Sequence, residues 1–204
     1  MLESIDISPS PQEEMNVSEC DLVIRAQRGD LVAFETLYRL YSERINRYIT
    51  RITGNYQVSC EITQDTFLKA WQGLPTLRDP VSFMAWLYRI ATNKAFNYIH
   101  RERKFSMVPW EQSVLPPVAS NLSELESRIE DRELIRLVLV GLRPTYRICL
   151  ILYVVEQLPR QRVAEILGIS ISSVDKYISR SKEAFRKMYY QLNAQMHAEL
   201  AKHT

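Results

Sequence analysis

The sequence is poor in glycine and lacks a long apolar run. Five glycines stand against eleven tyrosines in 204 residues, and this composition favours helices over turn-rich sheet. No stretch of apolar residues approaches the roughly 18 that a membrane span needs, and the acidic N-terminus is unlike a signal peptide. We therefore expect an all-α protein that works in the cytoplasm without membrane insertion.

Cysteine is scarce as well, and recognisable catalytic motifs are missing. Cys20, Cys60 and Cys149 lie far apart and form no Cys-x-x-Cys pair, which argues against a disulfide framework and against a zinc site. The sequence contains no Walker loop, no His-Glu-x-x-His and no Gly-x-Ser-x-Gly. These absences predict reduced thiols, no metal, no cofactor and no enzymatic activity.

The charge is nearly balanced overall but is unevenly distributed along the chain. The net charge is +2, while residues 1–24 hold six acidic side chains and no basic one. Residues 111–133 are also acidic, with six carboxylates against two cations, and segments 89–104 and 176–187 reverse that sign. Local basic faces on an otherwise neutral protein are typical of a nucleic-acid footprint.

Periodicity and punctuation predict a four-helix N-terminal domain at residues 19–105, after a disordered acidic tail at 1–18. Asp21 is expected to cap the first helix, and Gly54 to end the second in a left-handed conformation. The first helix is predicted to end near Gly29 and Asp30, and helices follow at residues 31–53, about 59–72 and about 83–104, with a loop at 76–82 before the last.

Three prolines and weak periodicity mark residues 106–122 as a flexible linker between two small domains. The second domain, residues 123–192, opens with a capping box formed by Ser123 and Glu126 and precedes a polar tail at 193–204. Its helices are predicted at 124–141, 144–156, 159–167 and 170–192. The short helix, the turn at Gly168 and the serine-rich start of the next helix predict a helix-turn-helix.

The last helix has an apolar face and a polar face. The apolar positions are Ile171, Val174, Ile178, Phe185, Met188 and Leu192. The opposite face of its first half presents Ser172, Ser173, Asp175, Lys176, Ser179 and Arg180. A helix-turn-helix inserts this part into the DNA major groove, and the alternative is a solvated face on an ordinary bundle helix.

A second basic face lies on the predicted fourth helix. It is formed by Arg89, Asn93, Lys94, Asn97, Arg101, Arg103 and Lys104. Cations bind the phosphate backbone without reading sequence, whereas asparagine amides can engage an unstacked base. On the same helix, Phe83, Trp86, Leu87 and Ile90 have the spacing of a buried face.

The sequence resembles bacterial sigma factors of the extracytoplasmic-function (ECF) type, which are promoter-specificity subunits of RNA polymerase. The resemblance covers roughly residues 19–192 and is carried by local strings in the expected order. They are Asp21-Leu-Val, Gly29-Asp30 with Ala33-Phe34, Gln64-Asp-Thr-Phe-Leu-Lys-Ala-Trp71, Trp86-Leu-Tyr-Arg-Ile-Ala-Thr-Asn93, and the helix-turn-helix.

The resemblance implies a partner for each surface. The helix-turn-helix would read the −35 promoter element, and the strip at 89–104 would read the −10 element. One flipped base would enter a pocket formed by the loop at 76–82, and Asn93 matches the family's base-reading asparagine. The helix with Glu61, Gln64, Asp65 and Lys69 would dock on core RNA polymerase, with a solvated polar face as the alternative.

The amino-acid sequence departs from the family's common pattern at two places. The family's common Gly-Thr-Val-Arg-Ser run is replaced by Ser172-Ser-Val-Asp-Lys176, and its Ala-Glu-Asp by Ser59-Cys-Glu61. Asp175 at the start of a recognition helix either accepts a hydrogen bond from a cytosine amino group or caps the helix. The first role changes base preference, and the second changes stability.

Two other functions remain open at this level. One is a stand-alone helix-turn-helix regulator with a sensing or dimerising N-terminal domain, which would bind promoter DNA without polymerase. The other is a helical enzyme using Glu61, Asp65 and His100. The acidic linker is either a phosphate mimic inside polymerase channels or a solvated spacer. The sequence also leaves open whether an anti-sigma factor binds the chain.

Overall fold

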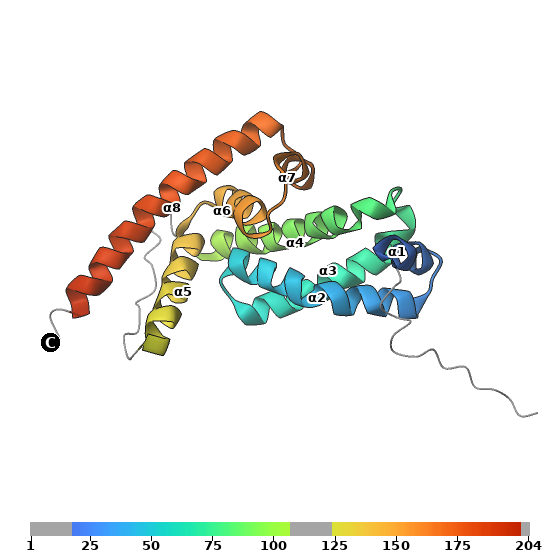
Figure 1. Ribbon diagram of the computed structural model, residues 1–204, viewed down its shortest axis with the longest axis horizontal. Coiled ribbons are helices and arrows are strands. Elements are labelled where there is room, and N and C mark those ends of the chain that lie inside the picture. The colour runs from blue at the N-terminus through green and yellow to red at the C-terminus, as the bar shows by residue number, and fades with distance from the viewer. Residues whose placement is uncertain (1–17, 107–123, 201–204) are drawn as a thin grey trace, which may run out of the picture.

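The computed structural model describes residues 18–106 and 124–200, and all regular structure within them is helical (Figure 1). The fold class is therefore all-α, as predicted. The predictions for the N-terminal tail, the linker and the Ser123–Glu126 capping box concern residues whose side chains the structure does not describe. The elements are α1 (Glu19–Gln27), α2 (Leu31–Thr53), α3 (Tyr56–Gly73), η2 (Leu74–Thr76), η3 (Pro80–Ser82), α4 (Phe83–Ser106), α5 (Glu124–Gly141), α6 (Pro144–Leu150), η5 (Ile151–Val155), α7 (Arg160–Leu167) and α8 (Ile171–Leu200).

In the N-terminal half, residues 18–106, helices α2, α3 and α4 run side by side and α1 crosses one end of them (Figure 1). Gly54 ends α2 with a left-handed φ of 73°, as expected. The predicted cap of α1 is wrong, because the Ser18 side chain accepts from the backbone N–H of Asp21 and Asp21 lies inside the first turn. Helix α3 begins earlier than expected, because Asn55 caps it.

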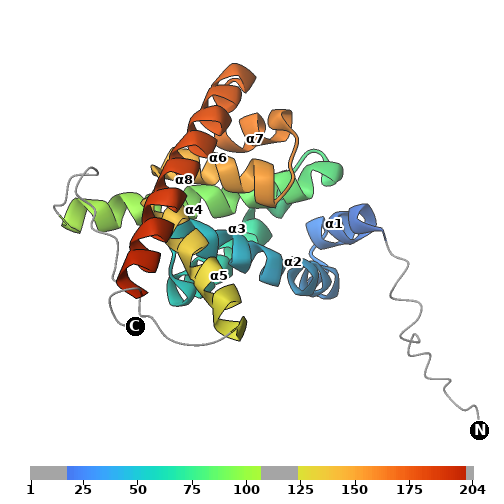
Figure 2. The same cartoon turned by 60° about the vertical axis from the view of Figure 1, so that its left-hand side comes forward.

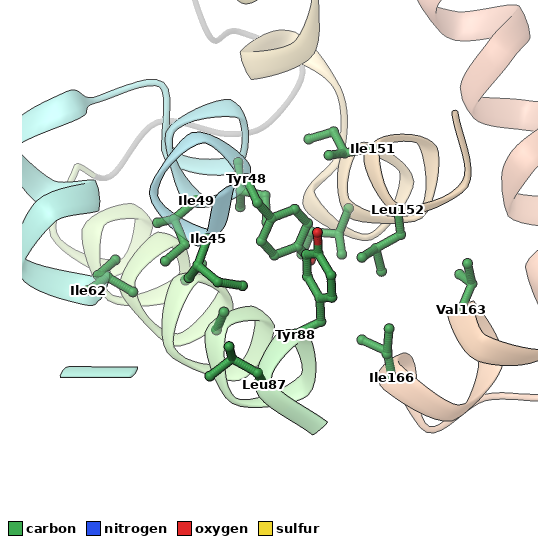
Figure 3. Packing of buried hydrophobic residues seen from close by; sticks show 14 of the residues in the cluster. Ile45, Tyr48, Ile49, Ile62, Leu87, Tyr88, Ile151, Leu152, Val163 and Ile166 are labelled. Carbon is green, nitrogen blue, oxygen red and sulfur yellow. The ribbon is translucent and has the colours of Figure 1, made fainter. Parts of the chain in front are cut away.

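The core of this half forms where the apolar stripe of α2 meets α4. Tyr48 is fully buried, and its hydroxyl lies 2.6 Å from that of Thr92 on α4. Its ring meets that of Tyr88 edge-on at 4.9 Å between centroids (Figure 3). This packing fixes one face of α4 inward, with Phe83 and Leu87 buried as predicted. Trp86 and Ile90 are half-buried against the same core.

In the C-terminal half, residues 124–200, α5 and α6 pack against the long α8, and α7 precedes it (Figure 2). The helix that starts at Pro144 ends in the π-helical turn η5, and Gln157 follows with a positive φ of 55°. Helix α8 runs on to Leu200, beyond the predicted end near Leu192. Ile171, assigned to its apolar face, is 48% exposed, because the packing face begins at the buried Val174.

The two halves pack against each other. Helix α7 lies on α4, and α5 and α6 contact α2. Figure 3 shows Ile151, Leu152 and Ile166 of the C-terminal half beside Tyr88 of the N-terminal half. One apolar cluster runs through both halves. The chain thus forms two helical domains, as predicted, and their apolar surfaces cover one another in this arrangement.

Candidate nucleic-acid interface

Four of the strip residues on α4 form an exposed row that winds along the helix. Arg89, Asn93, Asn97 and Arg101 recur every four residues, and all four are exposed. From Arg89 to Arg101 the helix rises about 18 Å, the length of about five stacked nucleotides at 3.4 Å each. The row has a cation at each end and two amides in its middle. Arg103 and Lys104 continue α4, and their side chains lie outside the described part.

Lys94 lies beside this row and is tied to the neighbouring helix. Its ammonium lies 3.0 Å from the carboxylate of Asp65 on α3, with 31% and 64% of the two side chains exposed. The structure thus connects a residue of the predicted −10 strip to a residue of the predicted docking face. An exposed pair of this kind contributes little to stability, so its main effect is to orient the ammonium and the carboxylate.

The loop expected to receive a flipped base, residues 76–82, ends directly before the first residue of α4. The Gln27 amide donates to the carbonyls of Leu74 and Leu77, at 3.2 and 2.6 Å, and ties the loop to α1. Asp79 caps η3 and accepts from the hydroxyl of Ser82 at 2.7 Å. These contacts hold the loop in a defined shape directly before α4.

The four docking candidates on α3 are all exposed. Glu61, Asp65 and Lys69 follow at intervals of four, and Gln64 lies beside them. The candidates predicted from the sequence do not include Leu68. Leu68 is 58% exposed, one turn after Gln64. A large apolar side chain within a polar face is typical of a protein-binding surface.

The helix-turn-helix on α7 and α8 has the expected turn and an exposed recognition face. Gly168 ends α7 with a left-handed φ of 66°. The Ser170 hydroxyl accepts from the backbone N–H of Ser173 at 3.2 Å and therefore caps α8. The remaining candidates on the first turns are exposed, namely Ser172, Asp175, Lys176, Ser179 and Arg180, with Ser173 half-buried.

Asp175 has a partner that sequence reasoning did not find. Its carboxylate lies 2.9 Å from the guanidinium of Arg160 at the start of α7, and both side chains are about half exposed. The Arg160 guanidinium also lies over the ring of Tyr153, 5.7 Å from the centroid. Since Ser170 caps α8, the predicted alternative that Asp175 serves as the cap is not supported. Asp175 instead links the two helices of the motif.

The remaining polar candidates do not assemble into a catalytic centre. His100 is exposed on α4 and contacts the ring of Phe96 edge-on, while Glu61 and Asp65 lie on α3 with Lys94 as the partner of the latter. Burial raises the pKa of the Cys149 thiol to about 11, and the charge of Asp175 adds to this effect. Such a thiol packs as a small apolar group.

The two surfaces define a helical protein with a basic, amide-containing row on one half and a helix-turn-helix on the other, and known proteins share this pattern. Residues 37–105 match the family description Sigma-70 region 2, and residues 132–185 match Sigma-70, region 4. The chain is 31% identical to the RNA polymerase sigma factor YlaC of Bacillus subtilis (strain 168), over 76% of this chain and 91% of the relative. It is 26% identical to the ECF RNA polymerase sigma factor SigW of the same organism, over 80% and 92%.

Among solved structures, the fold is similar to that of CnrH in complex with the cytosolic domain of CnrY. The TM-score is 0.63 at 22% identity, over 86% of this chain and 97% of that one. The chain belongs to the ECF group of RNA polymerase sigma factors. It is thus a promoter-specificity subunit of transcription initiation, as the resemblance implied, and not an enzyme. None of the described helices is both long and apolar enough to cross a membrane.

Proposed function

We propose that this sigma factor divides promoter recognition between the exposed row on α4 and the start of α8, and binds core polymerase through α3. The observation that carries the proposal is the exposure of all three predicted surfaces while the opposite face of each helix is buried. On α4, for example, Asn93 and Asn97 are exposed, whereas Ala91 and Ala95, each two residues before one of them, are fully buried.

The row on α4 is proposed to bind the −10 element. Its amides at Asn93 and Asn97 suit the edges of unstacked bases, and Arg89 and Arg101 suit the phosphates on either side. The loop at 76–82 would receive one flipped base. Arg103 and Lys104 would extend the phosphate contacts toward the C-terminal end of α4.

The start of α8 is proposed to bind the −35 element in the major groove. Lys176 and Arg180 are one turn apart and exposed, so both can reach guanine edges or phosphates. Ser172, Ser173 and Ser179 would supply hydroxyls near the backbone. The contact between Asp175 and Arg160 supports a joint role, in which the carboxylate orients the guanidinium at the groove edge.

The exposed face of α3 is proposed to dock on core polymerase. Glu61, Gln64, Asp65 and Lys69 provide polar contacts, and Leu68 provides an apolar centre. We further propose that the protein acts in the cytoplasm, where polymerase and promoter DNA are found, and that an anti-sigma factor is a candidate partner. The last point is supported by a solved structure of similar fold, with a TM-score of 0.61 at 18% identity, of the sigma factor RpoE in complex with the anti-sigma factor NepR from Bartonella quintana.

A mobility-shift experiment with and without core polymerase tests this proposal against a stand-alone regulator. Wild-type chain alone should leave promoter DNA unshifted, and chain plus core polymerase should form a specific complex that opens the duplex. The variant Lys176→Ala should weaken that complex on a promoter with both elements. A specific shift by the chain alone would contradict the proposal, because it would show that polymerase is dispensable.

A further inference from the structure

A nearly buried carboxylate lies between the two halves. The side chain of Glu156, directly after η5, is 6% exposed. It accepts from the hydroxyl of Tyr88 at 2.5 Å and from Nε of Arg44 at 3.2 Å, and the guanidinium of Arg51 lies 3.6 Å away. Burial, followed by the hydrogen bond to Glu156, raises the pKa of Tyr88 above its ordinary value. The hydroxyl therefore remains a donor at physiological pH.

Every partner that the structure gives this carboxylate belongs to the N-terminal half. Arg44 and Arg51 lie on α2 and Tyr88 on α4. Arg147, by comparison, donates to Ile52 on α2 but also to Val140 and Leu142 within its own half. Removing the Arg147 side chain would therefore damage the C-terminal half itself. Removing the Glu156 carboxylate would affect only the contact between the halves.

The backbone that presents Glu156 is unusual. The preceding five residues form the π-helical turn, and the N–H of Glu156 donates to the carbonyl of Ile151 at 3.0 Å. Gln157 then adopts a left-handed φ of 55°, which costs energy for a residue other than glycine. Segments of this kind occur frequently at functional positions. The chain thus maintains an unfavourable local conformation at the point where the carboxylate meets α2.

The packed arrangement is too short to place both promoter-reading surfaces on their elements. Elements centred at −10 and −35 lie about 85 Å apart on straight duplex at 3.4 Å per base pair. Arg162 of α7 contacts Ser82 just before α4, at 3.5 Å. The path from Asn93 through this contact to Ser172 is no longer than about 60 Å. The halves must separate before both surfaces can bind.

The same contact touches the loop at 76–82. Arg162 lies against the Ser82 hydroxyl, at the edge of the pocket proposed for a flipped base. The 17 residues between Ser106 and Glu124 can span up to about 60 Å when extended, so the covalent connection permits the separation. The packed form is therefore incompatible with two-element binding, and the chain is long enough to leave it.

We infer that Glu156 is an electrostatic latch that holds this sigma factor in a closed form, and that its release from Arg44, Arg51 and Tyr88 is required for promoter binding. The inference rests on the proposed assignment of the −10 and −35 surfaces. A protein whose binding-competent form is a minor population binds its partner more weakly by that fraction. Opening the latch should therefore tighten the apparent affinity of the chain for two-element promoter DNA in the presence of core polymerase.

Small-angle scattering of the full chain, combined with titration of the chain into core polymerase and two-element promoter DNA, tests the latch. Glu156→Ala should increase the radius of gyration while far-ultraviolet dichroism stays helical, and should tighten formation of the promoter complex by about tenfold. Glu43→Ala is the matched control, because the exposed Glu43 pairs with Arg47 on its own helix. Arg47→Ala is the control for Arg51→Ala, because Arg47 pairs with Glu43 within α2.

A charge exchange separates the latch from general damage. Arg44→Glu with Arg51→Glu places three carboxylates together and should open the chain. Adding Glu156→Arg to that pair should restore the small radius and the wild-type affinity. The latch is refuted if Glu156→Ala lowers the melting temperature without expanding the chain, or if the exchange fails to restore compactness. Failure of the wild-type chain to bind core polymerase would instead refute the proposed function, while the scattering still tests the latch.

Discussion

The N-terminal half carries two of the proposed binding surfaces and the C-terminal half carries the third, and they are built differently. In the N-terminal half both surfaces lie along whole helices whose other sides fill one core, and the pair between Lys94 and Asp65 joins them. In the C-terminal half the surface is the first turns of α8, positioned by Gly168, Ser170 and the pair between Asp175 and Arg160. Damage to the proposed docking face on α3 should therefore remove activity, whereas damage to the row on α4 or to the start of α8 should change selectivity.

The largest effect is expected from the docking face. Asp65→Lys should abolish co-purification with core polymerase, while stability changes by less than about 0.5 kcal/mol because the side chain is exposed. Asp65 also orients Lys94, so Glu61→Lys serves as a second variant without that contact. The control is Glu35→Lys, because Glu35 is an exposed carboxylate on a different helix, α2. Wild-type binding by both α3 variants would remove α3 from the docking surface.

Two glycines with similar backbone conformations allow the contact between the two halves to be compared with the turn of the helix-turn-helix. Gly54 and Gly168 have φ values of 73° and 66°, so alanine strains both. A Cβ at Gly54 would lie 2.5 Å from Cγ2 of Val140 in the other half, whereas one at Gly168 meets nothing within 4 Å. We expect Gly168→Ala to cost about 1 kcal/mol and Gly54→Ala about 1–3 kcal/mol more, from overpacking. Denaturant titration measures both, and equal costs would mean that the halves separate freely.

Base reading and phosphate binding should be separable on the row of α4. Asn93→Ala should relax preference at one −10 position by about 1–3 kcal/mol, because a base contact is lost. Arg101→Ala should weaken all promoters alike and flatten the salt dependence by roughly one phosphate. Competition binding across promoter variants at several salt concentrations measures both effects. A uniform loss for Asn93→Ala would exclude base reading.

The smallest effect concerns the pair at the helix-turn-helix. Exposed ion pairs contribute about 0.2–1 kcal/mol, so Asp175→Ala and Arg160→Ala should leave the melting temperature nearly unchanged. If the two side chains act together at the groove edge, both variants should alter preference at the same −35 position. Selection of binding sites from a random pool compares the two motifs. Changes at different positions would show that Asp175 reads a base independently of Arg160.

Local signals predicted the helices well, because each signal acts within a few residues. Gly54 and the three- and four-residue spacing in α2 gave correct boundaries, and Gly168 gave the turn. The errors arise where two neighbouring residues could fill the same role and the sequence does not say which one does. Ser18, for example, caps α1 in place of Asp21. The exposed Leu68 was not predicted, because apolar character alone does not say which side of a helix is covered.

The contacts between the halves could not be predicted from the sequence. Glu156 is separated from Arg44 by 112 residues and from Tyr88 by 68, and no periodic pattern connects positions so far apart. Arg160 and Asp175 escaped notice for a similar reason, since their pairing depends on the angle between α7 and α8. Three-dimensional packing thus supplies what short-range patterns lack, namely which charged side chains face each other.

Transcription from a random promoter library by core polymerase, with and without this chain, tests the division of promoter recognition most directly. The wild-type chain should select two motifs at a fixed spacing, and only in the presence of core polymerase. Asn93→Ala should change the −10 motif alone, and Lys176→Ala the −35 motif alone. If either variant changed both motifs, or if selection persisted unchanged in both, recognition would not be divided between α4 and α8.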